Sequence, residues 1–331
     1  MNEFDLISVG DASIDVFMRP IEGESICQLN DKECLICFTY GDKIPVKSLD
    51  FSIGGNAANN VVGTKRLGIK SGIVLTLGDD FVGNLIVEKL KAEGVDLTYV
   101  IQQPSTNSNF SSIIDYSGER TIFSYHAPRS YEFPVQLPVT PWMYLTSMGE
   151  SFRPFYKHVI EWLGKNPTVK LAFNPGSWQL KAGLKDGIAE VLARTEVIFV
   201  NREEAEGLTN FGKSQEKEKE LLQALGKLGP KVCIITDGGK GSFATNGQVF
   251  VKVGVLPVDA YQRTGAGDAF GSGCLAAIIK GKDLGEALIW GTVNSASVIG
   301  YIGAQKGLLK EDEIPEWLER ARSSGVKVEQ F

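Results

Sequence analysis

One stretch in the C-terminal half of the chain combines residue types that could transfer a charged group. Residues 264–273 are Thr-Gly-Ala-Gly-Asp-Ala-Phe-Gly-Ser-Gly, and the pattern predicts that Asp268 lies in the first turn of a helix. N–H groups of a first turn lack partners within the helix, and the helix dipole makes this end positive. Gly265, Ala266 and Gly267 could therefore bind an anion, while Asp268 could accept a proton from a nearby hydroxyl. The alternative is a glycine-rich loop in which Asp268 only stabilises the helix start.

The same predicted helix contains glycines at positions that would normally favour other residues. Gly267, Gly271 and Gly273 each cost about 0.8–1 kcal/mol relative to alanine, or roughly 3 kcal/mol together. We therefore expect this helix to approach another element or a ligand closely.

A second stretch matches the phosphate-loop pattern GxxxxGK[ST], from Gly207 to Lys213 and Ser214. That pattern requires a strand that runs directly into the loop. Here the expected strand Val197–Val200 is followed by residues 201–206, which predict a helical turn with three glutamates. We interpret Gly207 as the glycine after a helix end and Ser214 as the N-cap of the next helix.

The elements that would position these residues alternate between short apolar runs and helical patterns. This alternation predicts parallel βαβ units with helices on both faces of one sheet. The expected strands are Leu6–Val9, Ile73–Leu77, Met143–Ser147, Leu171–Asn174, Val197–Val200 and Val232–Thr236. The expected helices are Asn56–Leu67, Val82–Ala92, Pro154–Leu163, Leu184–Ala193, Gln215–Leu228, Asp268–Ile279 and Leu284–Ile299.

Two stretches, 16–50 and 98–133, break the alternation because they contain strand-like runs and no helix. Those runs are Leu35–Tyr40, Phe110–Tyr116 and Arg120–Tyr125. We expect one small β layer, built from both insertions, over the carboxyl edge of the parallel sheet, where ligands bind in this architecture. Residues 1–15, 51–97 and 134–331 would then form the α/β core.

Composition excludes several classes of function. The 331 residues include 34 Lys and Arg against 40 Asp and Glu, a net charge of −6, so binding to nucleic acid or to an anionic membrane is not expected. Only two histidines are present, His126 and His158, which argues against histidine catalysis and His-rich metal sites. No apolar run approaches the roughly 20 residues of a membrane span, and acidic residues stand where a signal peptide would be basic. The five cysteines favour a reducing cytoplasm, with Cys34 and Cys37 interpreted as strand residues and not as zinc ligands.

Further polar or glycine-rich segments follow predicted strands, and each alone is a common corner of an α/β fold. They are Val9-Gly-Asp11, Gly54-Gly-Asn-Ala-Ala-Asn59, Asn201-Arg-Glu-Glu204 and Thr236-Asp-Gly238-Gly-Lys-Gly241. Their order and spacing resemble those of the ribokinase-like family of carbohydrate kinases, which includes fructokinases, 2-keto-3-deoxygluconate kinases, the minor (pfkB-type) phosphofructokinases and adenosine kinase. The resemblance extends from Val9 to about Gly307, and its most specific part is Gly265–Gly273.

The resemblance implies a three-layer α/β/α core with a mostly parallel sheet, a β-sheet lid formed by the two insertions, and ATP-dependent phosphorylation of a small sugar. Asp268 would be the catalytic base, and the N–H groups of Gly265, Ala266 and Gly267 the anion hole. Residues implied in binding ATP and Mg²⁺ are Asn201 and Glu204 (Mg²⁺ through water), Thr236, Gly238, Gly241, Thr264 and Asn294 beside the adenine. Residues implied in binding the acceptor are Asp11, Asp15, Gly54, Gly55, Asn56, Asn59 and Glu150, whose carboxylates and amides suit a diol.

The sequence departs from the family in one place. The family usually has Asp-Thr-Thr before Gly-Ala-Gly-Asp, whereas this chain has Gln262-Arg263-Thr264, and Asp259 stands three residues too early. The missing carboxylate puts the usual monovalent-cation site in doubt. Arg263, if it points inward, could supply the positive charge instead.

The acceptor cannot be identified from the sequence. Arg120 and Arg129 could bind a carboxylate or phosphate of an acidic acceptor. A nucleoside kinase on the same scaffold is an alternative, in which lid aromatics stack on a base: Phe38, Tyr40, Phe110, Phe123 and Tyr125. A sugar-binding regulator without turnover is another. Exposed edge strands of the lid could pair two chains, so a homodimer is also a hypothesis.

Overall fold

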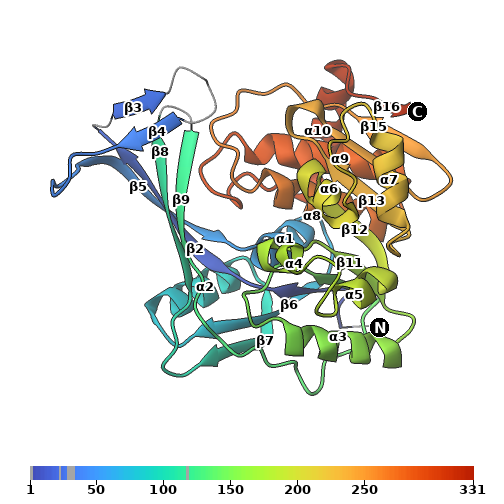
Figure 1. Cartoon of the computed structure of the whole chain (residues 1–331), viewed down its shortest axis with the longest axis horizontal. Helices are drawn as coiled ribbons and strands as arrows, with labels where there is room; N and C mark the ends of the chain where they lie inside the picture. The colour runs from blue at the N-terminus through green and yellow to red at the C-terminus, as the bar shows by residue number, and fades with distance from the viewer. Residues whose placement is uncertain (1–2, 22–23, 28–33, 117–118) are drawn as a thin grey trace.

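The apolar runs of the sequence form one large sheet in the computed structural model, which describes residues 3–21, 24–27, 34–116 and 119–331 (Figure 1). From edge to edge its strands are β7 (Asp96–Gln103), β6 (Ser71–Gly78), β1 (Leu6–Gly10), β10 (Trp142–Leu145), β11 (Lys170–Phe173), β12 (Thr195–Asn201), β13 (Val232–Thr236), β14 (Ser242–Thr245), β15 (Phe250–Val253) and β16 (Val328–Gln330). Neighbours from β7 to β13 are parallel, and those from β13 to β16 are antiparallel. The expected mostly parallel sheet is confirmed.

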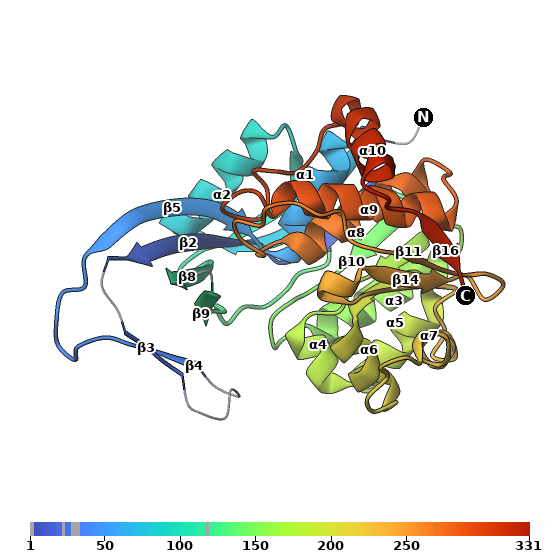
Figure 2. The ribbon, with the colours of Figure 1, turned by 90° about the horizontal axis from the view of Figure 1, so that it is seen from above.

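Helices cover both faces of this sheet, which gives the expected three layers (Figure 2). One layer contains α1 (Asn56–Arg66), α2 (Phe81–Ala92), α8 (Ala266–Ile279), α9 (Leu284–Val298) and α10 (Ile314–Ser323). The other contains α3 (Arg153–Lys165), α4 (Ser177–Ala182), α5 (Ile188–Arg194), α6 (Arg202–Thr209) and α7 (Glu218–Gly226). Single 3₁₀ turns, η1 and η2, lie at Gly238–Lys240 and Glu311–Glu313. In the described part of the chain, no helix has the length and apolar character needed to cross a membrane.

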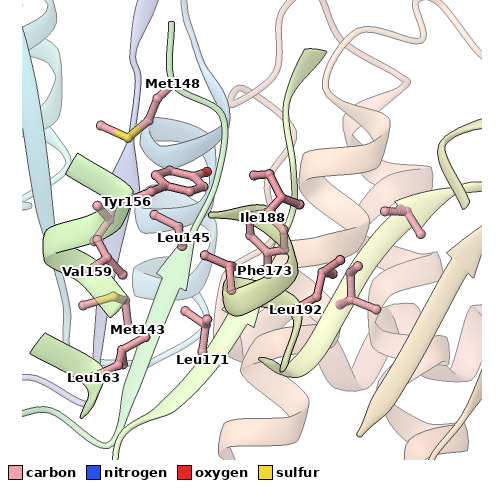
Figure 3. Packing of buried hydrophobic residues seen from close by; sticks show 14 of the residues in the cluster. Met143, Leu145, Met148, Tyr156, Val159, Leu163, Leu171, Phe173, Ile188 and Leu192 are labelled. Carbon is pink, nitrogen blue, oxygen red and sulfur yellow. The ribbon is translucent and has the colours of Figure 1, made fainter. Parts of the chain in front are cut away.

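The central strands are buried on both sides, so their successive side chains serve two cores. Met143 and Leu145 of β10 face α3, where Tyr156 and Leu163 pack against them (Figure 3). Tyr144, between them in the sequence, belongs to the core beneath α8 and α9. Full burial of each such aliphatic side chain contributes about 1.5–3 kcal/mol, which explains why the strands contain continuous apolar runs without alternation.

The second, smaller sheet has the strand order β5 (Val46–Gly54), β2 (Ser13–Pro20), β8 (Asn109–Tyr116) and β9 (Glu119–Tyr125), and we call it the lid. β2 and β8 are parallel, while the other neighbours are antiparallel. A separate hairpin, β3 (Glu24–Cys27) and β4 (Cys34–Cys37), extends from it (Figures 1 and 2). The boundaries differ from the expected 16–50 and 98–133 because β7 belongs to the large sheet and the lid strands begin at Ser13 and Asn109.

β1 lies at the point where the strand order reverses. The chain continues from β1 outward to β6 and β7 on one side, and later from β10 to β13 on the other. Connections on the two sides therefore diverge at the carboxyl end of β1 and leave a crevice there, where open α/β sheets bind ligands. Asp11 follows β1 directly at this edge.

Candidate active site

A cleft of about 640 Å³ opens at this carboxyl edge, between the large sheet and the lid. Residues from distant parts of the sequence meet in it, including many that sequence analysis had singled out. These are Asp11, Asp15, Gly55, Asn56, Asn59, Asn201, Glu204, Thr236, Thr264, Gly265, Ala266, Gly267 and Asp268. The fold thus assembles most of the expected site residues around one space.

The glycine-rich stretch forms the start of α8 on the floor of the cleft. Helical geometry begins at Ala266, and Gly265 before it has φ 79°, a left-handed conformation that glycine adopts without strain. A Cβ atom on Gly265 would also lie 2.4 Å from the Cβ of Ala304, so only glycine fits. This close turn leaves the first N–H groups of a 14-residue helix facing the cleft, where an anion could bind.

The remaining glycines of α8 fall into two groups, one beside the space for a ligand and one packed against another helix. Gly267 and Gly271 line the cleft, and a Cβ on either would meet no atom within 4 Å. Gly273 faces α9, where a Cβ would lie 2.8 Å from the carbonyl oxygen of Trp290. Helix packing therefore explains Gly273, and open space for a ligand is available beside Gly267 and Gly271.

Asp268 lies where a proton acceptor would be useful. The Nδ2 group of Asn59 donates a 2.7 Å hydrogen bond to its Oδ2 atom. Burial raises the pKa of Asp268 to about 6, and the negative charge of Asp15 adds to this rise, while the Asn59 hydrogen bond opposes it. A carboxyl with a pKa of about 6 is ionised at neutral pH and yet basic enough to take a proton from a hydroxyl.

Two further carboxylates lie where β1 and β2 meet the cleft. The Tyr131 hydroxyl donates to the carboxylate of Asp11 at 2.8 and 3.0 Å and accepts from the N–H of Gly149 at 2.7 Å. The Ser13 hydroxyl donates to Asp15 at 3.1 Å. Burial raises the pKa of both carboxyls, against the favourable charge of Arg129 at Asp11. Both side chains keep acceptor capacity toward the cleft.

A polar group in the cleft wall was not anticipated from the sequence. Asn174 lines the cleft, and its Oδ1 atom accepts from Asn56 Nδ2 and from the Tyr144 hydroxyl, each at 3.2 Å. Its Nδ2 group donates to the carbonyl of Phe199 at 2.8 Å. Its position in the sequence could have indicated this role, because Asn174 is the last residue of the expected strand Leu171–Asn174 and ligands bind at the carboxyl ends of such strands.

Asn201 and Glu204 form a reciprocal cap at the start of α6. Asn201 Oδ1 accepts from the N–H of Glu204, and Glu204 Oε2 accepts from the N–H of Asn201, both at 2.8 Å. Burial raises the pKa of Glu204. Only one of its carboxylate oxygens is engaged by the backbone, so the other is available at the cleft. Among the described residues, no three His, Cys, Asp or Glu side chains gather to hold a metal ion by themselves.

The oxygen atoms of Asn201 and Glu204 fit a Mg²⁺ ion that is held chiefly by phosphate and water, with Glu204 as an outer contact. Mg²⁺ in kinases keeps several waters and few protein ligands. These two side chains do not form an all-protein cage. Thr236 lines the cleft near them, while Gly238 and Gly241 form the turn after β13. Gly241 has φ 94°, and a Cβ there would meet the carbonyl of Val253.

Several expected contacts lie elsewhere in the described structure. Asn294 is fully buried between helices, where its Nδ2 donates to the Ala269 carbonyl at 2.7 Å and its Oδ1 accepts from the Leu309 N–H at 2.9 Å. Glu150 is exposed and does not line the cleft. Gly54 lies beneath Asp15, since a Cβ there would be 2.2 Å from Asp15 Oδ2.

The two candidate arginines have different surroundings. Arg129 is buried behind Asp11, where it donates to Asn109 Oδ1 at 3.0 Å and to two backbone carbonyls. Arg129 does not line the cleft in the described structure, and its contact with a substrate anion stays a prediction. Arg120, on the lid strand β9, lines the cleft with an exposed side chain. His126, which no sequence motif placed at a site, lines it too.

Lid aromatics do not line the cleft within the described residues. Those that had been considered for base stacking are Phe38, Tyr40, Phe110, Phe123 and Tyr125. Strand pairing explains this for three of them, because Phe110, Phe123 and Tyr125 alternate with the residues of β8 and β9 that do face the cleft. The lid surface over the cleft is accordingly polar.

The phosphate-loop match is not a phosphate site, but two details of its interpretation were wrong. Gly207 lies inside α6, which ends at Thr209 with Asn210 as a left-handed C-cap, and the N-cap of α7 is Lys217 and not Ser214. Ser214 is fully buried, and its N–H and hydroxyl both donate to Glu206 Oε1, at 2.7 and 2.6 Å. A carboxylate thus occupies donors that a phosphate would need.

Gln262, at the departure from the family pattern, links two loops. Its Oε1 atom accepts from the N–H of Gly303 at 3.1 Å, and its Nε2 atom is buried without a hydrogen-bond partner in the described structure. Arg263 next to it lines the cleft, while Asp259 is exposed. Of the cysteine pair, Cys37 is a free thiol and the side chain of Cys34 lies outside the described residues.

Comparison with known proteins agrees with this geometry. The family model of pfkB family carbohydrate kinases matches residues 23–311. An ATP-dependent 6-phosphofructokinase from Thermoanaerobacterium thermosaccharolyticum is 28% identical over 313 residues, covering 91% of this chain and 90% of that protein. Arabidopsis thaliana ribokinase complexed with ribose and ATP superposes with a TM-score of 0.77 at 20% identity, covering 96% and 99% of the two chains. A Burkholderia thailandensis nucleoside kinase in complex with inosine gives 0.74 at 19%, also covering 96% and 99%.

Proposed function

The chain belongs to the pfkB family of carbohydrate kinases, and we propose that it transfers the γ-phosphoryl group of ATP to a hydroxyl of a small sugar, with Asp268 as the base. The observation that supports this most strongly is the start of α8. It combines a carboxyl whose pKa is raised to about 6 with the unpaired N–H groups of a helix first turn, in one cleft.

In the proposed mechanism, Asp268 takes the proton of the acceptor hydroxyl as that oxygen bonds to the γ-phosphorus and the bond to ADP breaks. The N–H groups of Gly265, Ala266 and Gly267 hold the charge that develops on the transferred group. Asp11, Asp15, Asn56 and Asn59 would orient the acceptor by hydrogen bonds to its hydroxyls. Mg²⁺ bound with ATP would neutralise phosphate charge, with Glu204 holding it through water.

ATP would occupy the side of the cleft formed by Thr236, Asn201 and Thr264, next to the Gly238–Gly241 turn. An acidic protein with free buried thiols, supplied with ATP, suits the cytoplasm, and we propose that location. We also propose a homodimer formed through the lid.

For the acceptor, the polar lid surface favours a sugar over a nucleoside. Asn109, Ser111 and Ser124 face the cleft, whereas the lid aromatics point away from it. An acceptor that carries a phosphate or carboxylate is a second candidate, because Arg120 faces the cleft and makes no ion pair or hydrogen bond that would neutralise it in the described structure. The phosphofructokinase named among the relatives acts on a substrate of that kind.

The test is ADP release with a panel of acceptors: fructose, ribose, 2-keto-3-deoxygluconate, fructose 6-phosphate, myo-inositol and nucleosides. Matched neutral and anionic pairs, such as fructose and its 6-phosphate, separate the two candidates. Saturable ADP release with one sugar, lost in Asp268→Asn, would support the proposal. Binding of sugars without ADP release by the wild-type protein would instead indicate a regulator without turnover.

A further inference from the structure

The segment that follows α9 contacts the catalytic end of α8 at several points. We call Gly303–Leu309 the bracket segment. Ala304 packs against Gly265, where it excludes any side chain from that position. The N–H of Gly303 donates to Gln262 at 3.1 Å. Gln305 follows Ala304 directly, and its side chain points toward α1.

Gln305 determines how the amide of Asn59 is oriented. Its Nε2 group donates a 3.0 Å hydrogen bond to Asn59 Oδ1, and Asn59 Nδ2 donates a 2.7 Å hydrogen bond to Asp268 Oδ2. Asn59 is 2% exposed and Gln305 is 8% exposed, so water does not compete freely for these atoms. An amide has one acceptor atom and one donor group. With the acceptor engaged by Gln305, only N–H groups face the carboxylate.

The bracket segment is itself anchored to the helix that carries Asn59. Arg66 Nη1 donates to the carbonyls of Gln305 and Leu308 at 2.8 and 3.0 Å. Glu93 holds the same guanidinium through two hydrogen bonds of 3.0 and 2.6 Å. Asn59 and Arg66 are seven residues apart on α1 and therefore lie on one face. Helix α1 thus holds Gln305 by hydrogen bonds to the Gln305 backbone, through Arg66, and to the Gln305 side chain, through Asn59.

We propose that Gln305 is a positioning residue for phosphoryl transfer, which fixes Asn59 so that its Nδ2 group donates to Asp268 and to the acceptor oxygen beside it. This inference rests on the proposed function of Asp268 as the base. If Asn59 turned over, its carbonyl oxygen would meet the carboxylate as a second acceptor. The ionised base would lose a hydrogen bond, and the acceptor would lose its donor.

The pKa of Asp268 reports on this arrangement, because the Asn59 hydrogen bond favours the ionised form. Other charged or titratable groups also face that carboxyl. Asp15 from β2 and Glu204 from α6 are negative, Tyr144 from β10 is neutral because burial raises its pKa, and Arg263 lines the same cleft. None of these groups changes when Gln305 is replaced.

The first variant is Gln305→Glu, which keeps the shape, replaces the Nε2 donor by an acceptor oxygen and adds a negative charge that raises the pKa of Asp268 in the same direction. The carboxyl signals of aspartate-labelled protein, followed by ¹³C NMR during a pH titration, give the pKa of Asp268 without any activity, and Asp268→Asn identifies the signal. We expect Gln305→Glu to raise this pKa by about one pH unit, the tenfold effect of one hydrogen bond to a charged group. The acid limb of kcat/KM should move by the same amount.

Gln305→Met removes the donor without adding a charge, and it should raise the pKa in the same direction by less. Arg66→Met is the comparison variant, because it removes the backbone anchor of the bracket segment and keeps the Gln305 side chain. It should lower Tm and shift the acid limb less than Gln305→Met does. An unchanged pKa in Gln305→Met, or a shift in Arg66→Met as large as that in Gln305→Met, would overturn the proposal. If the Gln305 variants shift the pKa of Asp268 but the wild-type protein phosphorylates no acceptor, the positioning role of Gln305 stands and the proposed function is contradicted instead.

Discussion

At the scale of single residues, Asp268 has properties that a helix-start aspartate alone would not need. A capping carboxylate is normally solvated and acidic, whereas burial raises the pKa of this one to about 6. General-base catalysis contributes about 10²–10⁴ in rate, or roughly 2.7–5.4 kcal/mol. We therefore expect Asp268→Asn to lower kcat at least about a hundredfold, with little change in the affinity for ATP. A loss smaller than about tenfold in steady-state assays would mean that Asp268 only stabilises the helix.

The raised pKa also predicts opposite effects of pH on activity and on stability. The base must be ionised, so kcat/KM should fall as the pH decreases through about 6. Stability changes in the other direction, because a carboxyl whose pKa is raised by folding favours the folded state below that pKa and loses this contribution as the pH rises through it. Asp268→Asn should therefore raise Tm at pH 8 more than at pH 5. Thermal unfolding of both proteins at the two pH values checks this, and an equal change at both would contradict it.

Gln262 predicts how the enzyme responds to potassium. A cation beside the anion hole needs oxygen ligands, preferably with a carboxylate. Gln262 provides one neutral oxygen, which already accepts from Gly303, and Arg263 lines the cleft as a fixed positive charge. We expect kcat/KM to be nearly equal in tetramethylammonium, sodium and potassium buffers of one ionic strength. A gain of about tenfold or more specific to potassium would point to Asp259 as a displaced ligand.

At the scale of elements, the alternation of β9 places one charge over the cleft. Arg120, Ile122 and Ser124 line it, while Phe123 and Tyr125 point to the other face. Arg19 on β2 of the same sheet is already paired with Asp115 at 2.8 Å. Arg120 is thus the lid cation that an anionic acceptor could meet, whereas Arg263 lines the cleft beside the start of α8.

We expect Arg120→Gln to lower the ratio of kcat/KM for fructose 6-phosphate over fructose by about tenfold or more, because a hydrogen bond between charged groups contributes about 1.5–3 kcal/mol. Arg19→Gln is the matched control and should leave the ratio unchanged. Steady-state kinetics with both acceptors measure it. An unaltered ratio in Arg120→Gln would show that this arginine does not select the acceptor.

Helices and strands with a clear pattern of apolar residues could be predicted from the sequence, whereas strands defined by long-range pairing could not. Buried strands such as β1, β6 and β12 appeared as apolar runs bounded by turns. β7 has no such run, because as an edge strand it is only half-buried, and it was assigned to the lid. The last strand of the antiparallel edge, β16, was missed because it is exposed and pairs across about 75 residues of sequence.

The same limit applies to the candidate site. Motif spacing predicted the residues that meet in the cleft from β1, α1, α6 and α8. It could not predict Asn294, because a buried asparagine and a ligand-binding asparagine look alike until its partners are known. The same holds for Arg129, whose buried partner Asn109 could not be read from the sequence. Gln305 and Asn174 were missed because their roles depend on contacts with residues 246 and 118 positions away.

At the scale of the whole molecule, the lid has a polar surface toward the cleft and an apolar surface away from it. On the outer surface, strand pairing aligns Phe51, Val16, Ser112 and Phe123 in one row, and Leu49, Met18, Ile114 and Thr121 in the next. Phe51 and Phe123 are 50% and 60% exposed. Between these residues Val16 is only 5% exposed, and Met18 packs against the core, so the exposed apolar side chains belong to the edge strands β5 and β9. Figure 2 shows that β2 and β5 extend away from the large sheet. Exposed apolar side chains on both edge strands of one small sheet can contribute to an interface.

A second copy of the same chain is the simplest cover for that surface, because a two-fold axis lets one patch pack against itself. The edge strands β5 and β9 would also lie near such an interface, which would reduce the hazard of unpaired edges. We expect multi-angle light scattering to give twice the chain mass at micromolar concentration. Phe51→Lys with Phe123→Lys should yield monomers with an unchanged Tm for the core, whereas Phe81→Lys, which replaces a phenylalanine 78% exposed at the start of α2, should remain dimeric. A monomeric wild-type protein would contradict the prediction.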